Sequence, residues 1–280
     1  MKVKLLYILL FCTVTKTYSQ LETPNIELVK KFLNTKTCFV LDNDPFSECN
    51  IQLKTSAEKF WTLTPYEIIG LEEFEKRRKK NEYSFVSIDE VYFDNEKNPI
   101  KYKFLCIYLG GNYKTESDMP QIVTIPLAYA EDEESNYAYK IGTILIFAQN
   151  HIQTLLQNPD LKKFNIIEYY NKNKEKLENK TLYLLKDEVE PKLQSEIAFK
   201  RIYPYSFKFV TREEIEQAID NKNPDVVFLH KVGPGKKYGS KTYKIILSTK
   251  DAKIYYFDYH TVSQNKPDAI LESDIKNLIK

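Results

Sequence analysis

The chain has 280 residues, of which 41 are basic and 39 acidic, so its formal net charge is only +2. A hydrophobic content of 42% is enough for ordinary cores and excludes a disordered chain. The near balance of charge excludes an overall basic field that would hold a nucleic acid. We interpret the basic run at residues 76–80 and the acidic run at 131–134 as solvated surface.

Residues 1–19 have the pattern of a secretory signal peptide. Lys2 and Lys4 supply the charged start, and residues 5–14 supply an apolar core that is too short to span a bilayer. Small residues precede a predicted cleavage before Gln20. No later segment is apolar enough to cross a membrane, so we expect a soluble exported protein, periplasmic or extracellular. The abundance of Lys, Asn, Ile and Tyr is typical of a low-GC, bacterial genome.

Three cysteines remain after this cleavage, Cys38, Cys49 and Cys106, and their odd number leaves at least one unpaired. Cys38 and Cys106 fall in apolar runs, where free cysteine is a common small core residue. We therefore favour three buried thiols, while export leaves a Cys38–Cys49 disulfide open as the alternative. A lipid on Cys12 is disfavoured because Phe11 is too bulky for the usual lipidation motif.

The stretch 179–215 repeats the earlier stretch 34–68. The aligned pairs are Thr37 with Thr181, Pro45 with Pro191, Thr64 with Thr211 and, further along, Tyr102 with Tyr243. This duplication predicts two copies of one unit, repeat 1 in residues 20–158 and repeat 2 in residues 159–280.

In repeat 1 we expect an entry helix that starts at Thr23 and Pro24. The expected strands are 37–41, 60–63, 83–88, 102–109 and 121–128, and the expected helices start at Asp44, start at Thr64 and span 139–157. Pro126 has no amide hydrogen for a ladder, so the strand that contains it belongs at an edge or a bulge.

Repeat 2 shows the same order of elements. We expect an entry helix at 164–179, strands at 182–185, 205–210, 226–232, 242–249 and 253–262, and helices that open at Pro191, are capped by Thr211 and span 271–279.

The predicted fold class is therefore α/β, a tandem duplication of a small three-layer-type unit of order β-α-β-α-β-β-β-α. Each repeat forms a mixed five-stranded sheet in the order 2-1-3-4-5, because the first three strands are joined by right-handed crossovers and the last two by hairpins. This order resembles the small mixed-sheet α/β domains at the start of TolB-like periplasmic proteins. The resemblance is one of topology alone and implies no function.

His230, Asp258 and His260 form the most suggestive cluster of chemical groups. Asp258 and His260 are two residues apart on one expected strand, so they share a face of it, and two imidazoles with a carboxylate are suitable metal ligands. The alternative is that these side chains face water or are hydrogen-bonded under a helix, since another strand separates His230 from the other two.

The loop 233–241 holds three of the seven glycines together with Lys236, Lys237 and Tyr238. It joins two strands, and its spacing is not that of a phosphate-binding Walker loop. Repeat 1 has an acidic loop at 94–99 in the same place. Loops held by rigid sheets often bind partners, so Lys236, Lys237 and Tyr238 are candidate binding residues. An idle mobile hairpin is the alternative.

No recognised hydrolase, metalloprotease or dinucleotide-binding motif occurs in the sequence. We therefore expect an exported, non-catalytic binding or scaffold protein without a cofactor, whose partner is a protein or a small polar ligand. The alternative is a metal-dependent hydrolase, or another enzyme, that uses the region of His230, Asp258 and His260. The oligomeric state stays open.

The signal-peptide pattern makes the first testable prediction. The mature chain is expected to begin at or near Gln20, because cleavage follows the small residues that end the apolar segment. N-terminal sequencing of the secreted product measures this directly. A product that keeps Met1, or one that carries a lipid on Cys12, would contradict the prediction.

Overall fold

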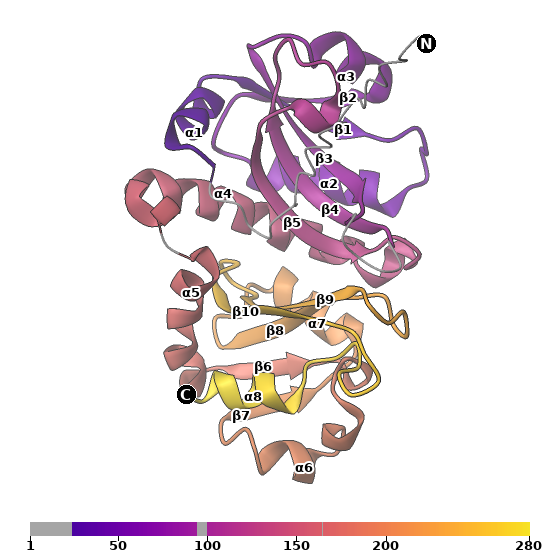
Figure 1. Cartoon of the computed structure of the whole chain (residues 1–280), viewed down its shortest axis with the longest axis vertical. Helices are drawn as coiled ribbons and strands as arrows, with labels where there is room; N and C mark the ends of the chain where they lie inside the picture. The colour runs from indigo at the N-terminus through magenta and orange to yellow at the C-terminus, as the bar shows by residue number, and fades with distance from the viewer. Residues whose placement is uncertain (1–23, 94–99, 164) are drawn as a thin grey trace, which may run out of the picture.

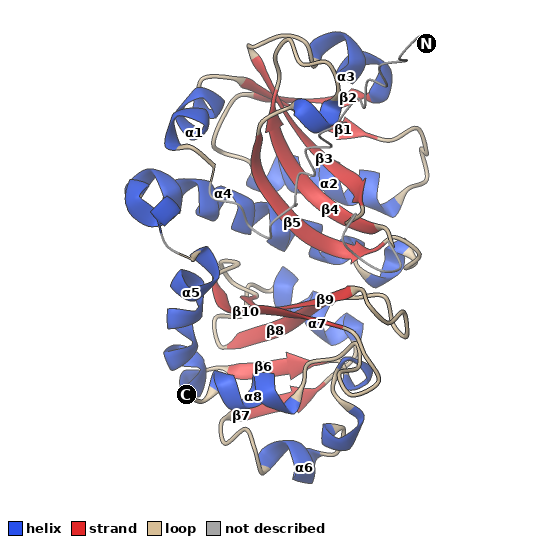
Figure 2. Cartoon of the chain, in the orientation of Figure 1, coloured by secondary structure: helices blue, strands red, loops and turns tan. Residues whose placement is uncertain are grey.

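The computed structural model describes residues 24–93, 100–163 and 165–280. The predicted signal peptide, Thr23, the acidic loop at 94–99 and Phe164 lie outside these ranges. The first helix begins at Ile26 and is capped by Asn25, so the predicted helix start at Thr23 and Pro24 is wrong. Figures 1 and 2 show two sheet-containing units stacked along the long axis of the molecule. Within the described ranges, no helix is long and apolar enough to cross a membrane.

The first unit contains sheet A, whose strands lie in the order β2-β1-β3-β4-β5. The strands are β1 (Lys36–Leu41), β2 (Tyr66–Gly70), β3 (Tyr83–Val91), β4 (Tyr102–Leu109) and β5 (Gln121–Tyr129). The α-helices are α1 (Ile26–Leu33), α2 (Glu48–Phe60), α3 (Leu71–Arg77) and α4 (Ile141–Gln157).

The second unit contains sheet B, in the order β10-β9-β8-β6-β7. Its strands are β6 (Thr181–Leu184), β7 (Ser206–Phe209), β8 (Val226–Val232), β9 (Lys241–Ser248) and β10 (Ile254–Thr261). Its α-helices are α5 (Ile166–Asn171), α6 (Glu196–Lys200), α7 (Arg212–Asp220) and α8 (Glu272–Leu278). The entry helix predicted at 164–179 is split, because α5 ends at Asn171 and a 3₁₀ segment at Lys172–Asn179 follows it.

The duplicated α/β architecture and the strand order 2-1-3-4-5 are confirmed in both units. Tyr102 pairs with the last residue of β3 and Tyr243 with the last residue of β8, so these two tyrosines are structurally equivalent. Pro126 lies on the edge strand β5 at a shift in register, as its missing amide hydrogen requires. Cys38, Cys49 and Cys106 are buried free thiols.

The second strand of repeat 1 was misplaced by the sequence pattern. α2 continues to Phe60, and β2 occupies 66–70, where we expected a helix that starts at Thr64. The side chain of Thr64 instead accepts a hydrogen bond from the Trp61 indole, while the carbonyl of Pro65 accepts one from the Thr37 amide. Thr211 does cap α7, so the predicted equivalence of Thr64 with Thr211 is wrong.

The two repeats differ most in the lengths of their helices. α2 and α4 have 13 and 17 residues, whereas α6 and α8, at the same places in the order of elements, have 5 and 7. Because a helix rises about 1.5 Å per residue, the helices of repeat 2 cover much less of their sheet. Part of β7 is therefore left uncovered.

The two units share one continuous hydrophobic core. The equivalent residues Tyr102 and Tyr243 are both fully buried, and their rings meet edge to face with centroids 5.8 Å apart. Phe104 packs on the ring of Tyr243 at 6.0 Å. The Tyr102 hydroxyl accepts a hydrogen bond from the Lys241 amide at 2.9 Å and donates one to the Lys241 carbonyl at 2.8 Å.

Two buried histidines belong to this core. Nε2 of His230 lies 2.9 Å from the carbonyl oxygen of Pro126 in the other repeat, and Nδ1 of His151 lies 2.7 Å from the Tyr170 hydroxyl. Burial lowers the pKa of His230 to about 3 and that of His151 to about 4, from an ordinary value of 6.5. Both side chains are therefore neutral in the folded chain at neutral pH.

These pKa shifts predict a loss of stability in acid. Below pH 6.5 the two histidines take up protons in the unfolded chain but not in the folded chain. Their contribution to the free energy of unfolding is therefore complete above pH 6.5 and decreases as the pH falls towards 4. The expected slope is roughly 1.4 kcal/mol per pH unit for each histidine.

His230→Gln isolates one of these contributions, since a glutamine amide still donates to the Pro126 carbonyl but does not titrate. Urea unfolding between pH 7 and 4.5 should show a shallower loss for His230→Gln than for the unchanged protein. Parallel curves for the two proteins would refute the assignment, because all other titrating groups are shared.

Candidate functional site

The structure does not bring the three candidate metal ligands together. His230 lies on β8, while Asp258 and His260 lie on β10, and β9 separates the two strands. His230 is fully buried between the repeats, where its Nε2 contacts the Pro126 carbonyl. Among the residues that the structure describes, no group of three His, Cys, Asp or Glu side chains is placed to hold a metal ion.

Asp258 and His260 make other contacts. Asp258 accepts hydrogen bonds from the Tyr256 hydroxyl and from the Tyr259 amide, at 3.1 and 2.7 Å. Nε2 of His260 lies 2.9 Å from the Pro267 carbonyl, and burial lowers the pKa of this imidazole. Both side chains therefore serve hydrogen bonds within repeat 2.

The glycine-rich loop contacts repeat 1. Nζ of Lys237 forms an ion pair with Glu131 at 2.8 Å, donates to the Tyr129 hydroxyl and lies 5.0 Å from the centre of the Tyr129 ring. The acidic run at 131–134 is therefore engaged in part with the other repeat. Lys236 is exposed, and the side chain of Tyr238 is 53% exposed. Their role as binding residues stays a prediction.

A largely buried ion pair supports the base of this loop. Nζ of Lys231 lies 2.7 Å from Asp268, and the same carboxylate oxygen accepts a hydrogen bond from the Gly235 amide. The Asp268 carboxylate packs directly over Gly233, where an added Cβ would lie 1.9 Å from one of its oxygens. The glycine at 233 thus permits the ion pair, which explains one of the three glycines in structural terms.

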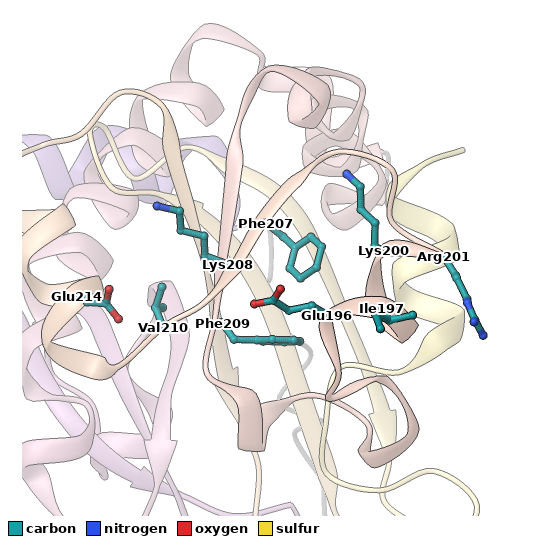
Figure 3. A pocket seen from close by; sticks show the side chains of 9 residues that line it. All are labelled: Glu196, Ile197, Lys200, Arg201, Phe207, Lys208, Phe209, Val210 and Glu214. Carbon is teal, nitrogen blue, oxygen red and sulfur yellow. The ribbon is translucent and has the colours of Figure 1, made fainter.

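A groove that combines apolar walls with a strand edge lies along β7. It has a volume of about 780 Å³, and its lining is Glu196, Ile197, Lys200, Arg201, Phe207, Lys208, Phe209, Val210 and Glu214. Figure 3 shows these side chains on both sides of the strand, with Ile197 and Arg201 on one side and Val210 and Glu214 on the other.

The connections of β7 explain the two walls of the groove. The chain runs from β6 to β7 and then back to β8, on the other side of β6. Right-handed crossovers in opposite directions place α6 and α7 on opposite faces of the sheet. β7 therefore lies between two helices, with its outer edge at the bottom of the groove.

The outer edge of β7 carries backbone groups that the sheet does not use. Phe209 stands opposite Leu184 on β6, and the Val210 amide donates to the Leu184 carbonyl at 3.0 Å. Backbone groups of successive residues in a parallel strand alternate between its two sides. The amide and carbonyl groups of Phe207 and Phe209 therefore face outward, and no strand in the described ranges pairs with them.

Aromatic packing holds this edge in place. The buried ring of Phe199 on α6 lies 4.5 Å from the ring of Phe207 and 5.7 Å from that of Phe209. Both strand phenylalanines remain partly exposed, and Ile197, two residues before Phe199 on α6, is 72% exposed. The groove is therefore preformed and has an apolar surface that water contacts.

The charged side chains at the groove are only partly engaged. Nζ of Lys200 donates to the Pro204 and Tyr205 carbonyls, and the Glu214 carboxylate accepts a hydrogen bond from the Thr211 amide at the start of α7.

Arg201, Lys208 and Glu196 also line the groove, and no ion pair with another described residue engages them. Two cations against one anion leave a small positive excess at the groove.

The groove along β7 was not predicted from the sequence, although the sequence contains part of the signal. The alternation of aromatic and lysine side chains around Lys208 indicated a half-buried strand, and the order 2-1-3-4-5 placed that strand at an edge. The missing information was the length of α6, because the run after Pro191 did not show that only five residues form the helix.

Searches of protein-family models, of curated proteins and of solved structures find no match to this chain.

The packing of Gly233 predicts a large effect of a small substitution. Gly233→Ala places a methyl group against Asp268 and Thr242 and so forces the largely buried Lys231–Asp268 pair apart. This change is expected to cost about 3 kcal/mol of unfolding free energy. Gly235→Ala meets no neighbouring atom but must adopt a φ of +67°, so about 1 kcal/mol is expected.

Urea unfolding measures the free energy of unfolding of Gly233→Ala and Gly235→Ala for this comparison. Equal, small losses for both would show that the carboxylate moves aside and that the ion pair does not constrain the loop.

Proposed function

We propose that this protein is an exported, non-catalytic binding or scaffold protein that holds an extended segment of a partner protein along β7. The main observation that supports this proposal is that the outer edge of β7 lies at the bottom of an apolar groove between α6 and α7. An added strand would complete the sheet and fill the groove at once. This mode of recognition takes affinity from main-chain hydrogen bonds and specificity from side-chain contacts.

The main-chain hydrogen bonds to a partner strand would be made by Phe207 and Phe209. Their outward amide and carbonyl groups offer the alternate donors and acceptors that a neighbouring strand needs. Exposed edges invite unwanted pairing, and proteins usually block them. The edge of β10 is blocked here, because the side chain of Asn171 bonds both the amide and the carbonyl of Phe257 and that of Asn173 bonds the Ile254 carbonyl. β7 has no such cover in the described structure.

The side-chain contacts in the groove would determine which partner segment binds. Alternate residues of a bound strand would face α6, where Ile197, Phe207 and Phe209 offer apolar contacts. Arg201 and Lys208 favour acidic residues beside them. The partner segment is therefore extended, apolar at alternate positions and net acidic.

The predicted signal peptide supports the setting of this function outside the cytoplasm. An exported chain with two duplicated cores and no recognised catalytic motif suits a role in holding another protein.

Ile197 provides a test with a matched control, since Ile51 is the exposed isoleucine of α2 in the other repeat. The two are 72% and 55% exposed, so substituting either by Asp should change stability little. The probe is a phage-displayed library of dodecapeptides panned on the mature chain. Selected peptides should show the alternating apolar and acidic pattern.

Ile197→Asp should weaken the selected peptides about tenfold, through a lost apolar contact and a new like charge, whereas Ile51→Asp should leave their affinity unchanged. In hydrogen exchange, bound peptide should protect the amides of Phe207 and Phe209. Peptides that bind Ile197→Asp as tightly as the unchanged chain, or that protect neither amide, would exclude the β7 groove as the site.

A further inference from the structure

A second hollow, of about 380 Å³, lies between the two repeats and is independent of the β7 groove. α2 and α4 of repeat 1 form one side, and the end of α7 with the turn between β9 and β10 forms the other. Both repeats thus contribute side chains to a single cleft, and only their association creates it.

Three lysines gather around this cleft, Lys59 from α2, Lys222 after α7 and Lys250 from the β9–β10 turn. Asp220 is the acidic residue among the lining residues. All four side chains are exposed, and no ion pair with a described residue engages the lysines. The cleft therefore has an excess of two positive charges, although the whole chain is nearly neutral.

Hydroxyl groups and rings complete the lining. Ser56 and Thr143 are buried residues that border the cleft, and a hydroxyl group can both donate and accept hydrogen bonds. Thr249 also borders the cleft, but its hydroxyl donates to the Asn223 carbonyl at 2.7 Å. Phe60 and Tyr139 add aromatic surface on the side of repeat 1. The set combines cations, hydroxyl donors and flat apolar surface within one small volume.

The backbone at this cleft is unusual. Lys222 and Ala252 are the two residues other than glycine with positive φ in the described ranges, at 48° and 54°, and both line the cleft. Lys222 follows the C-cap of α7, where the Asn223 amide bonds back to the Ala218 carbonyl. Glycine is the usual residue at such a position, because a Cβ is strained there.

The strained position holds a lysine whose side chain reaches across to repeat 1. Nζ of Lys222 lies 5.5 Å from the centre of the Phe60 ring. The ammonium group is thus held over the cleft against an aromatic face, close to the side of the cleft that carries Lys59. A lysine at a position that favours glycine indicates that its side chain has a role there.

We propose that this cleft binds a small phosphate-bearing anion, either inorganic phosphate or a small phosphate ester. Lysines serve as point charges for phosphate oxygens, and the hydroxyl groups of Ser56 and Thr143 would donate to the same oxygens. The ring of Phe60 offers a surface for the organic part of an ester. A bound anion would contact both repeats at once and stabilise their association.

The experiment is calorimetric titration of the mature chain with inorganic phosphate and with phenyl phosphate in low-salt buffer. Both should bind one equivalent, and added sodium chloride should weaken them. Tighter binding of phenyl phosphate than of phosphate identifies the ester as the ligand class, and equal binding identifies the phosphate group alone.

Lys222→Gly separates binding from folding. Glycine relieves the strained φ, so the melting temperature of the variant in the absence of ligand should be no lower than that of the unchanged chain, while its affinity for phosphate should fall about tenfold. Lys59→Ala should lose affinity similarly. Lys54→Ala removes a lysine from the same helix outside the cleft and should bind as the unchanged chain does.

Absence of phosphate binding by the unchanged chain would overturn the proposal, and so would unaltered binding by Lys222→Gly and Lys59→Ala. Failure of this proposal leaves the β7 groove untouched, since the two sites share no residue.

Discussion

The burial of Tyr102 against Tyr243 is the contact on which the rest of the molecule depends. These equivalent residues meet at the centre of the interface, and the Tyr102 hydroxyl is satisfied by the backbone of Lys241. Each fully buried aromatic side chain contributes on the order of 2 kcal/mol. Because the pair is buried only when the repeats meet, the two units are expected to behave as one cooperative structure.

The unequal helix lengths of the two repeats explain the groove along β7. In repeat 1 the long helices α2 and α4 pack on each other and cover their sheet. In repeat 2 the equivalents are short, so aromatic residues that would face a helix are left at the surface along β7. The cleft between the repeats arises differently, because side chains of both repeats line it.

Polar side chains of the types found in catalytic or metal sites make structural contacts in this protein. His230 bonds the carbonyl of Pro126 and so pairs a buried backbone group on the edge strand β5. Lys244 pairs with Asp274 in a buried ion pair at 2.7 Å, which fixes α8 on sheet B. Breaking such a buried pair is costly, because one charge is left without a partner. These contacts account for much of what a search for catalytic residues would select.

The sequence by itself determined the class and the order of the elements. Repeated apolar runs, capping residues such as Thr211 and the equivalence of Tyr102 with Tyr243 predicted two mixed sheets in the order 2-1-3-4-5, because periodicity and capping are local properties of the chain. It misplaced β2, since residues 66–70 fit a helical period as well as a strand. Only the tertiary structure decided that His230 is buried away from His260, that Lys237 pairs with Glu131, and that a groove lies along β7 and a cleft between the repeats. Those facts depend on distances between segments far apart in the sequence and on helix lengths, and no local pattern encodes them.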